Sequence, residues 1–110
     1  MARQSEDPAP IEDNTAAGRF EINIQGATAY QEYSRGPAEL VLVHTEVPPA
    51  LSGRGLASRL TRHGLELARR EGLRVALVCP FALGWVERHP EYQYLLDRPG
   101  GTAAPELPWM

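Results

Sequence analysis

The sequence contains one cysteine, no apolar run long enough to cross a bilayer and only a small net charge. A single cysteine excludes an internal disulfide and a cysteine-based metal cluster, and no metal site is expected. A net charge of −3 argues against nucleic acid or an anionic membrane as the main partner. The acidic N-terminal stretch has no apolar signal region. Together with the lone cysteine, this predicts a cytoplasmic protein.

The chain has 110 residues, enough for one domain with a modest core. Its 43% hydrophobic and 23% charged residues are ordinary for a globular protein. Residues 1–17 contain little to bury and are predicted to form a disordered tail. Residues 98–110 are rich in proline and glycine and are predicted to form a second tail. The folded domain is therefore expected to span residues 18–97.

Three strands are predicted in the N-terminal half, over residues 19–24, 27–35 and 39–47. In the first two, apolar and polar residues alternate, and a Gln-Gly turn joins them into a hairpin. The third contains the apolar run 40–43, which is typical of a central strand covered on both faces.

A long helix is predicted over residues 54–71, where Leu56 and Leu60 recur at helical spacing. Ser52 is its expected N-cap, and Gly72 is expected directly after its end.

An apolar strand follows over residues 73–78. A short helix begins after it, with Cys79 as N-cap and Pro80 at the first helical position. A strand–helix–strand crossover makes its two strands parallel. The sequence therefore predicts an α/β fold with a mixed sheet of about four strands, antiparallel at first and parallel at the end, flanked by helices.

The carboxyl ends of the two parallel strands lie at one edge of the sheet, where α/β proteins bind their ligands. His44 and Glu46 lie near the end of one strand and Cys79 at the end of the other. The turn before the long helix starts at the same edge. Gly53 and Gly55 let the backbone approach a ligand closely, and Arg54 adds positive charge. Free amides and the helix dipole favour an anion here, so this turn is predicted to bind phosphate or pyrophosphate.

Two common phosphate-binding motifs are set aside. No Lys-Ser/Thr pair follows the turn, so it is not a Walker A loop. Ser58 stands where a dinucleotide-binding turn has its third glycine or alanine, and no acidic residue ends the next strand. Nucleotide hydrolysis and NAD binding are therefore not expected.

Four short motifs occur in order: His44-Thr45-Glu46-Val47-Pro48, Gly53-Arg54-Gly55, Cys79-Pro80-Phe81 and Arg88-His89-Pro90-Glu91-Tyr92. Over about residues 18–96 the chain resembles the small YjdJ-type domains of the GNAT superfamily of acyl-CoA-dependent N-acyltransferases. The phosphate loop of that superfamily follows the pattern Gln/Arg-x-x-Gly-x-Gly/Ala. Gly55 and Ala57 match its last two fixed positions, and Ser52 stands at the first.

The resemblance implies acetyl-CoA as acyl donor and an amine, not identified by the sequence, as acceptor. The pyrophosphate would lie on the turn made by Ser52, Gly53, Arg54, Gly55, Leu56 and Ala57. The pantetheine arm would run between the two parallel strands, where it would form strand-like hydrogen bonds beside Thr45, Val47 and Pro80. Neither a nucleic-acid nor a membrane partner is expected from the net charge and hydropathy, and the sequence does not indicate the oligomeric state.

The catalytic roles stay open between alternatives. Cys79 is either a small buried core residue or a nucleophile that accepts the acetyl group. A helix N-terminus favours a thiolate, and YjdJ-type domains place a cysteine here. His44 or Glu46 could instead deprotonate the amine for direct attack. A Cys–His pair is also geometrically possible.

A function of a different class is also compatible with the sequence, namely binding of CoA or acyl-CoA without catalysis. Ser52 replaces the family's Gln or Arg, and the short helix lacks the tyrosine that often protonates the departing thiolate. Tyr92 is predicted to be a packed aromatic residue, and His63 and His89 are predicted to be structural.

Overall fold

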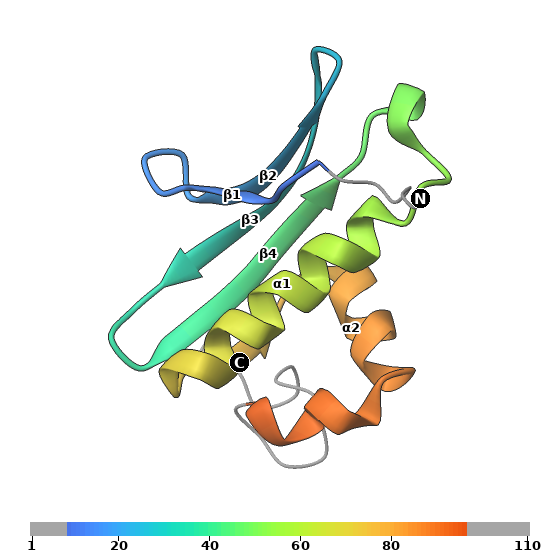
Figure 1. Cartoon of the computed structure of the whole chain (residues 1–110). Coiled ribbons are helices and arrows are strands. Elements are labelled where there is room, and N and C mark those ends of the chain that lie inside the picture. Colours follow the sequence, from blue (N-terminus) through green and yellow to red (C-terminus); the bar gives the residue numbers. More distant parts are fainter. Residues whose placement is uncertain (1–8, 97–110) are drawn as a thin grey trace.

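The computed structural model describes residues 9–96, in which one mixed sheet has helices packed against it (Figure 1). Its elements are β1 (Glu12–Asn14), β2 (Arg19–Ile24), β3 (Ala27–Arg35), β4 (Glu39–Glu46), the 3-10 helix η2 (Pro49–Leu51), α1 (Leu56–Glu71), β5 (Arg74–Leu77), α2 (Pro80–Glu87) and the 3-10 helix η3 (Pro90–Leu95). The five strands lie in sequence order, antiparallel from β1 to β4 and parallel between β4 and β5. The predicted fold class is therefore confirmed, with five strands instead of about four.

The additional strand is β1, which lies inside the segment 1–17. A disordered tail is the wrong prediction for this part of that segment. The strand pairs with β2 from Glu12 to Asn14, and the Tyr33 hydroxyl donates to Asp13 at 2.5 Å. Composition predicted disorder because residues 12–14 are polar, and it does not reveal that they pair with the next strand or contact Tyr33. Residues 1–8 of this predicted tail and the predicted tail 98–110 lie outside the described residues.

Helix α1 begins two residues later than predicted, and its N-cap is Gly55, not Ser52. Ser52 instead closes η2, where its backbone amide and its hydroxyl both donate to the Pro49 carbonyl. Gly72 ends the helix as predicted, with φ 70° and its amide bonded to the carbonyl of Ala68.

The core lies between α1 and the covered face of the sheet, by which we mean the face that α1 packs against. Its fully buried side chains include Phe20, Ile22, Leu40, Leu42, Leu60 and Leu65. Gly64 lets the helix approach closely, because a Cβ at this position would lie 3.1 Å from Cδ2 of Leu42. In Figure 1 α1 runs along β4, with α2 beside it.

Full cover of β4 on both faces is not observed in the described part of the chain. Leu40 and Leu42 are fully buried, whereas Val41 and Val43 on the other face are only partly buried. The apolar run 40–43 predicted cover on both sides, but α1 covers only one of them. We call the other side, which carries Arg19, Glu21, Tyr30, His44 and Glu46, the open face.

Candidate functional site

Strands β4 and β5 separate at the edge where the sequence placed the site. Their pairing ends at Leu42–Leu77, while β4 continues to Glu46 paired with β3. The amides of Val78 and Cys79 both donate to the carbonyl of Leu42 at 3.0 Å. The chain that follows β5 is therefore held beside Leu42 and does not pair with the rest of β4. Within residues 9–96, no strand pairs with the β5 side of β4 beyond Leu42. An extended ligand could add backbone hydrogen bonds there.

A bulge in β4 decides which side chains share a face. Leu42 is opposite Tyr33 and His44 is opposite Glu32, so Val43 is an extra residue without a partner on β3. An extra residue of this kind changes the alternation of the strand. Without it, His44 would lie on the covered face with Leu42.

The bulge places His44 and Glu46 together on the open face. His44 Nε2 lies 3.0 Å from Glu46 Oε1, and the two side chains are 50% and 55% exposed. A carboxylate only accepts hydrogen bonds, so Nε2 carries the proton and donates it. When the ring is neutral, Nδ1 is left with a free lone pair. The pair thus has the arrangement of a base and the group that orients it.

The next residue along β4, Thr45, faces the other way. Its Oγ1 lies 3.3 Å from the sulfur of Cys79, which is only 2% exposed. Cys79 is the N-cap of α2, as predicted, but its side chain makes no capping hydrogen bond. Because His44 and Thr45 lie on opposite faces, the Cys–His pair that the sequence allowed is not formed.

A buried glutamine, Gln31, completes the group around Cys79, and sequence reasoning did not select it. Its Nε2 donates to Oγ1 of both Thr45 and Thr61, each at 3.1 Å, and the residue has no exposed surface. Because Thr45 Oγ1 accepts from Gln31, its own proton is free to be donated to the sulfur of Cys79. The sequence did contain one indication of Gln31: it is a polar residue at a position that the alternation of its strand predicts to be buried. Its partners come from β4 and α1 and are not local.

The glycine turn has the conformation expected of an anion site. Gly53 and Gly55 have φ 80° and 72°, a region that costs other residues free energy. A Cβ at either glycine would meet no atom within 4 Å, so backbone conformation and not crowding requires glycine here. That free space leaves the turn accessible to a ligand. No side chain caps α1, whose first amides therefore keep their donors free, and Arg54 is exposed beside them.

The other predicted binding residues differ in exposure. Leu56 is buried in the core, so only its backbone amide can serve a ligand. Val47 and Ala57 are partly buried, while Ser52 and Pro80 are exposed.

The fourth motif forms a packing cluster between η3, α2 and α1. Tyr92 donates to Glu66 at 2.7 Å and accepts a hydrogen bond from Arg62 at 3.3 Å. Burial, followed by the bond to Glu66, raises the pKa of Tyr92. His89 stacks on Trp85, with ring centroids 3.7 Å apart. These contacts agree with the structural roles predicted for Tyr92 and His89.

His63 also has a packing role. Its ring lies edge-on to Phe20 at 4.8 Å, and burial lowers its pKa.

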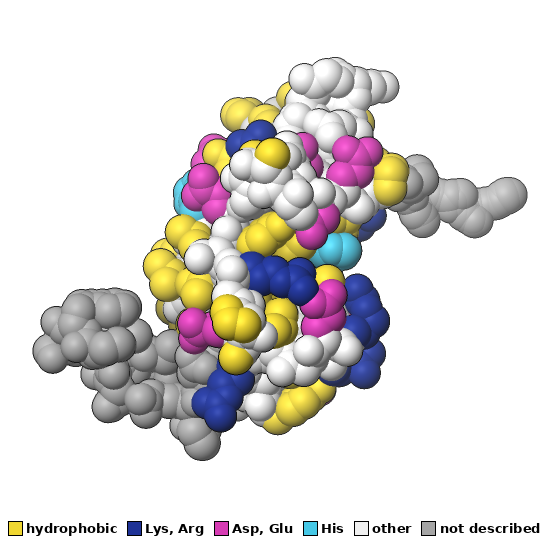
Figure 2. All heavy atoms as spheres, turned by 90° about the vertical axis from the view of Figure 1, so that its left-hand side faces the viewer, with side chains coloured by type: hydrophobic (Ala, Val, Ile, Leu, Met, Phe, Trp, Pro, Cys, Tyr) yellow, Lys and Arg dark blue, Asp and Glu magenta, His cyan; other side chains and the backbone are white. Residues whose placement is uncertain are grey.

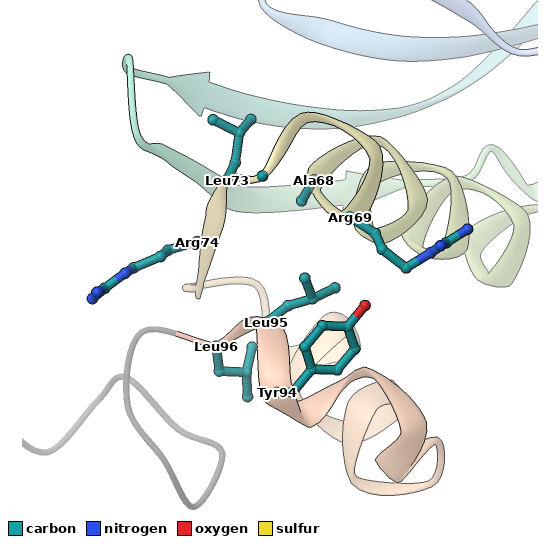
Figure 3. A pocket seen from close by; sticks show the side chains of 8 residues that line it. Ala68, Arg69, Leu73, Arg74, Tyr94, Leu95 and Leu96 are labelled. Carbon is teal, nitrogen blue, oxygen red and sulfur yellow. The ribbon is translucent and has the colours of Figure 1, made fainter.

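A hollow of about 560 Å³ lies at the carboxyl end of α1 (Figure 3). It is lined by Ala68, Arg69, Gly72, Leu73, Arg74, Tyr94, Leu95 and Leu96. None of the predicted site residues lines it, and the glycine turn lies at the other end of the same helix. The candidate site is therefore the open edge between β4 and β5, not this hollow.

Neither a metal-binding cluster nor a membrane-spanning helix is found in residues 9–96. No group of three or more His, Cys, Asp or Glu is placed to hold a metal ion there. No helix in this range is both long and apolar enough to cross a membrane. Figure 2 shows acidic, basic and apolar side chains interspersed on one face of the molecule.

The chain is similar to known proteins in sequence and in fold. Residues 19–95 match the family described as GCN5-related N-acetyl-transferase. Protein NATD1 of Gallus gallus and of Mus musculus are each 33% identical over 92 residues, covering 80% of this chain and 83% of theirs. A GCN5-like protein from Staphylococcus aureus, solved by NMR, superposes with a TM-score of 0.63 at 26% identity, covering 80% of this chain and 87% of that one. The chain therefore belongs to the GCN5-related N-acetyltransferase family.

Proposed function

We propose that this protein transfers an acetyl group from acetyl-CoA to an amine in the cytoplasm. One observation carries the proposal. The strands β4 and β5 separate after Leu42–Leu77 beside a helix N-terminus whose turn contains two glycines of positive φ. The paired His44 and Glu46 lie on the part of β4 that has β3 on one side and no strand on its β5 side.

The residues present fit acetyl-CoA, which would supply an acetyl group already activated as a thioester. The free amides at the start of α1 and the Arg54 guanidinium suit the pyrophosphate, because both offer hydrogen-bond donors and positive potential. The backbone from Thr45 to Val47 has no strand on its β5 side, and this side suits the amide groups of the pantetheine arm. The Ser52 hydroxyl donates to Pro49, so it contributes less to the turn than a Gln or Arg side chain would.

In this proposal His44 is the general base. Its Nδ1 accepts a proton from the attacking amine while Glu46 holds Nε2–H and stabilises the charged ring. Glu46 is then a positioning residue instead of the base itself. Both side chains are about half exposed, so an acceptor can reach them from the open face.

Direct attack of the amine is favoured over an acetyl-Cys79 intermediate. The sulfur of Cys79 is buried and bonded to Thr45, and forming a thioester there would need space that the 2% exposure does not provide. In this reading Cys79 helps to hold the ends of β4 and β5 in place.

A second candidate function, binding of acyl-CoA without catalysis, has one specific observation in its favour. The hydroxyl of Tyr92 is bonded to both Glu66 and Arg62, so this tyrosine is not free to protonate a departing thiolate.

The test is to incubate the protein with acetyl-CoA and a pool of amines and peptides, and to measure CoA release and acetylated products by mass. The chain contains no lysine, so an acetyl adduct on the protein itself would point to Cys79, a hydroxyl group or the terminal amine. We expect turnover without an adduct at Cys79, and Cys79→Ala should keep most of it.

Each outcome separates the alternatives. An acetylated Cys79 together with an inactive Cys79→Ala would overturn direct attack. A thermal shift with CoA but no release with any acceptor would favour the non-catalytic function. A ligand at about 100 times its Kd adds roughly 2.7 kcal/mol of stability, so the absence of any shift at millimolar CoA would contradict both functions.

A further inference from the structure

The open face carries a connected row of side chains that leads from β2 to the candidate base. The guanidinium of Arg19 lies over the ring of Tyr30, 4.1 Å from its centroid. The ring of Tyr30 meets that of His44 at an interplanar angle of 61°, with centroids 6.4 Å apart. His44 in turn donates to Glu46. Cation–ring and edge-to-ring contacts of this kind are favourable and directional.

The strand register explains why these side chains meet. Tyr30 is directly opposite Glu46 on one side and Glu21 on the other. Side chains at such opposed positions lie about 5 Å apart at Cβ. Arg19 and His44 are both directly opposite Glu32, two residues along β3, so each is a diagonal neighbour of Tyr30 and within reach of its ring. The ring of Tyr30, on the middle strand, therefore contacts Arg19 on β2 and His44 on β4.

The far end of the row is fixed by β1. Arg19 Nε donates to Glu21 at 2.7 Å, and the amide of Asn14 on β1 donates to the same carboxylate oxygen at 3.1 Å. Glu21 is only 9% exposed, which makes it a more rigid anchor than a surface carboxylate. The Arg19 hydrogen bond is the main reason why the pKa of Glu21 is lowered.

We propose that Tyr30, held by Arg19, is a positioning residue that restricts the ring of His44 to the orientation in which Nδ1 faces the acceptor. The predicted effect of Tyr30 on catalysis rests on the proposed function, whereas its effect on the order of the His44 ring does not. Without such support an exposed histidine bonded through one nitrogen would sample several rotamers. A small misplacement of a catalytic group can lower a rate by roughly 100-fold, so partial loss of orientation should be measurable.

The first test measures order and not activity. NMR relaxation of the His44 ring C–H groups should give order parameters near those of rigid backbone, roughly 0.85, in the wild type. Tyr30→Leu should lower them to below about 0.6, whereas Tyr30→Phe, which keeps the ring, should not. Arg19→Met, which removes the cation above the Tyr30 ring, should give order parameters between those of Tyr30→Leu and Tyr30→Phe. Unchanged order in Tyr30→Leu would overturn the inference, even if the protein is an active acetyltransferase.

The second test separates positioning from a structural role. Tyr30→Leu should lower kcat by roughly tenfold with KM for acetyl-CoA unchanged, because the phosphate turn is not touched. Tyr94→Leu is the matched control, since Tyr94 is 67% exposed and lies at the other end of α1. A rise in KM for acetyl-CoA without loss of kcat would contradict positioning. If the wild type has no acetyltransferase activity, the proposed function fails, and the ring-order measurement still decides this inference.

Discussion

The two faces of β4 are chemically opposite although they are built from consecutive residues. On the open face, His44 and Glu46 are half exposed and bonded to each other. On the covered face, the partly buried Thr45 forms a polar group with two buried residues, Gln31 and Cys79. The difference indicates that the first pair is available to a substrate, whereas the second group contributes to stability. Predictions that separate the two faces follow, from the largest expected effect to the smallest.

Replacement of Gln31 should have the largest effect. Gln31→Ala leaves the hydroxyls of Thr45 and Thr61 without their shared donor and opens a cavity in the core. We expect the free energy of unfolding to fall by about 3 kcal/mol. Urea denaturation measures this change. A loss below about 1 kcal/mol would show that the buried group does not support the fold.

Replacement of His44 should lower activity and leave stability nearly unchanged. His44→Ala should lower kcat by about 100-fold or more, the range typical of a lost general base. Its free energy of unfolding should change by no more than about 0.5 kcal/mol, because the side chain is exposed. Steady-state kinetics and urea denaturation on one preparation check both values. Full activity in His44→Ala would remove His44 from the proposed mechanism.

The glycine turn can be tested against a glycine of the same backbone conformation. Gly55 has φ 72° and Gly72, at the other end of α1, has φ 70°, with open space around both. Alanine at either position should cost about 1 kcal/mol of stability through backbone strain. Only Gly55→Ala should weaken CoA binding, as measured by calorimetry. Equal weakening by Gly72→Ala would indicate a general effect of helix destabilisation.

The smallest effect concerns pH. Burial lowers the pKa of His63 in the folded protein, so the unfolded chain binds its proton first as the pH falls. Stability from neutral His63 is present above the unfolded pKa of about 6.5 and is lost as the pH falls through the lower folded value. His63→Phe should make stability less dependent on pH between about 7 and 5. Because Glu21 and Glu66 also have lowered pKa values, their contribution is lost at more acidic pH.

The sequence predicted those parts of the molecule that depend on local periodicity. Strands β2 and β3 have the predicted bounds, and α1 ends where Gly72 indicated. The crossover rule predicted that β4 and β5 are parallel with their carboxyl ends at one edge of the sheet, and the glycines marked the turn before α1.

The faces of the site could not be predicted in the same way. Val43 lies in a continuous apolar run, so nothing marks it as the extra residue of a bulge. His44 and Cys79 were placed together because the ends of parallel strands share one edge, which does not tell on which face each side chain lies. The hydrogen-bond partners of Gln31 and the pairing of β1 depend on contacts between different elements. The pattern of residues within one element does not predict such contacts.

The bulge at Val43 also has a consequence for how this domain can diversify. Because it turns His44 and Glu46 outward and Thr45 inward, substitutions on the open face need not disturb the packing against α1. Most mutations that change activity are constrained by the stability they cost. Here that constraint is relaxed, so under the proposed function the same edge could serve different acceptors in related chains through changes confined to one side of the sheet.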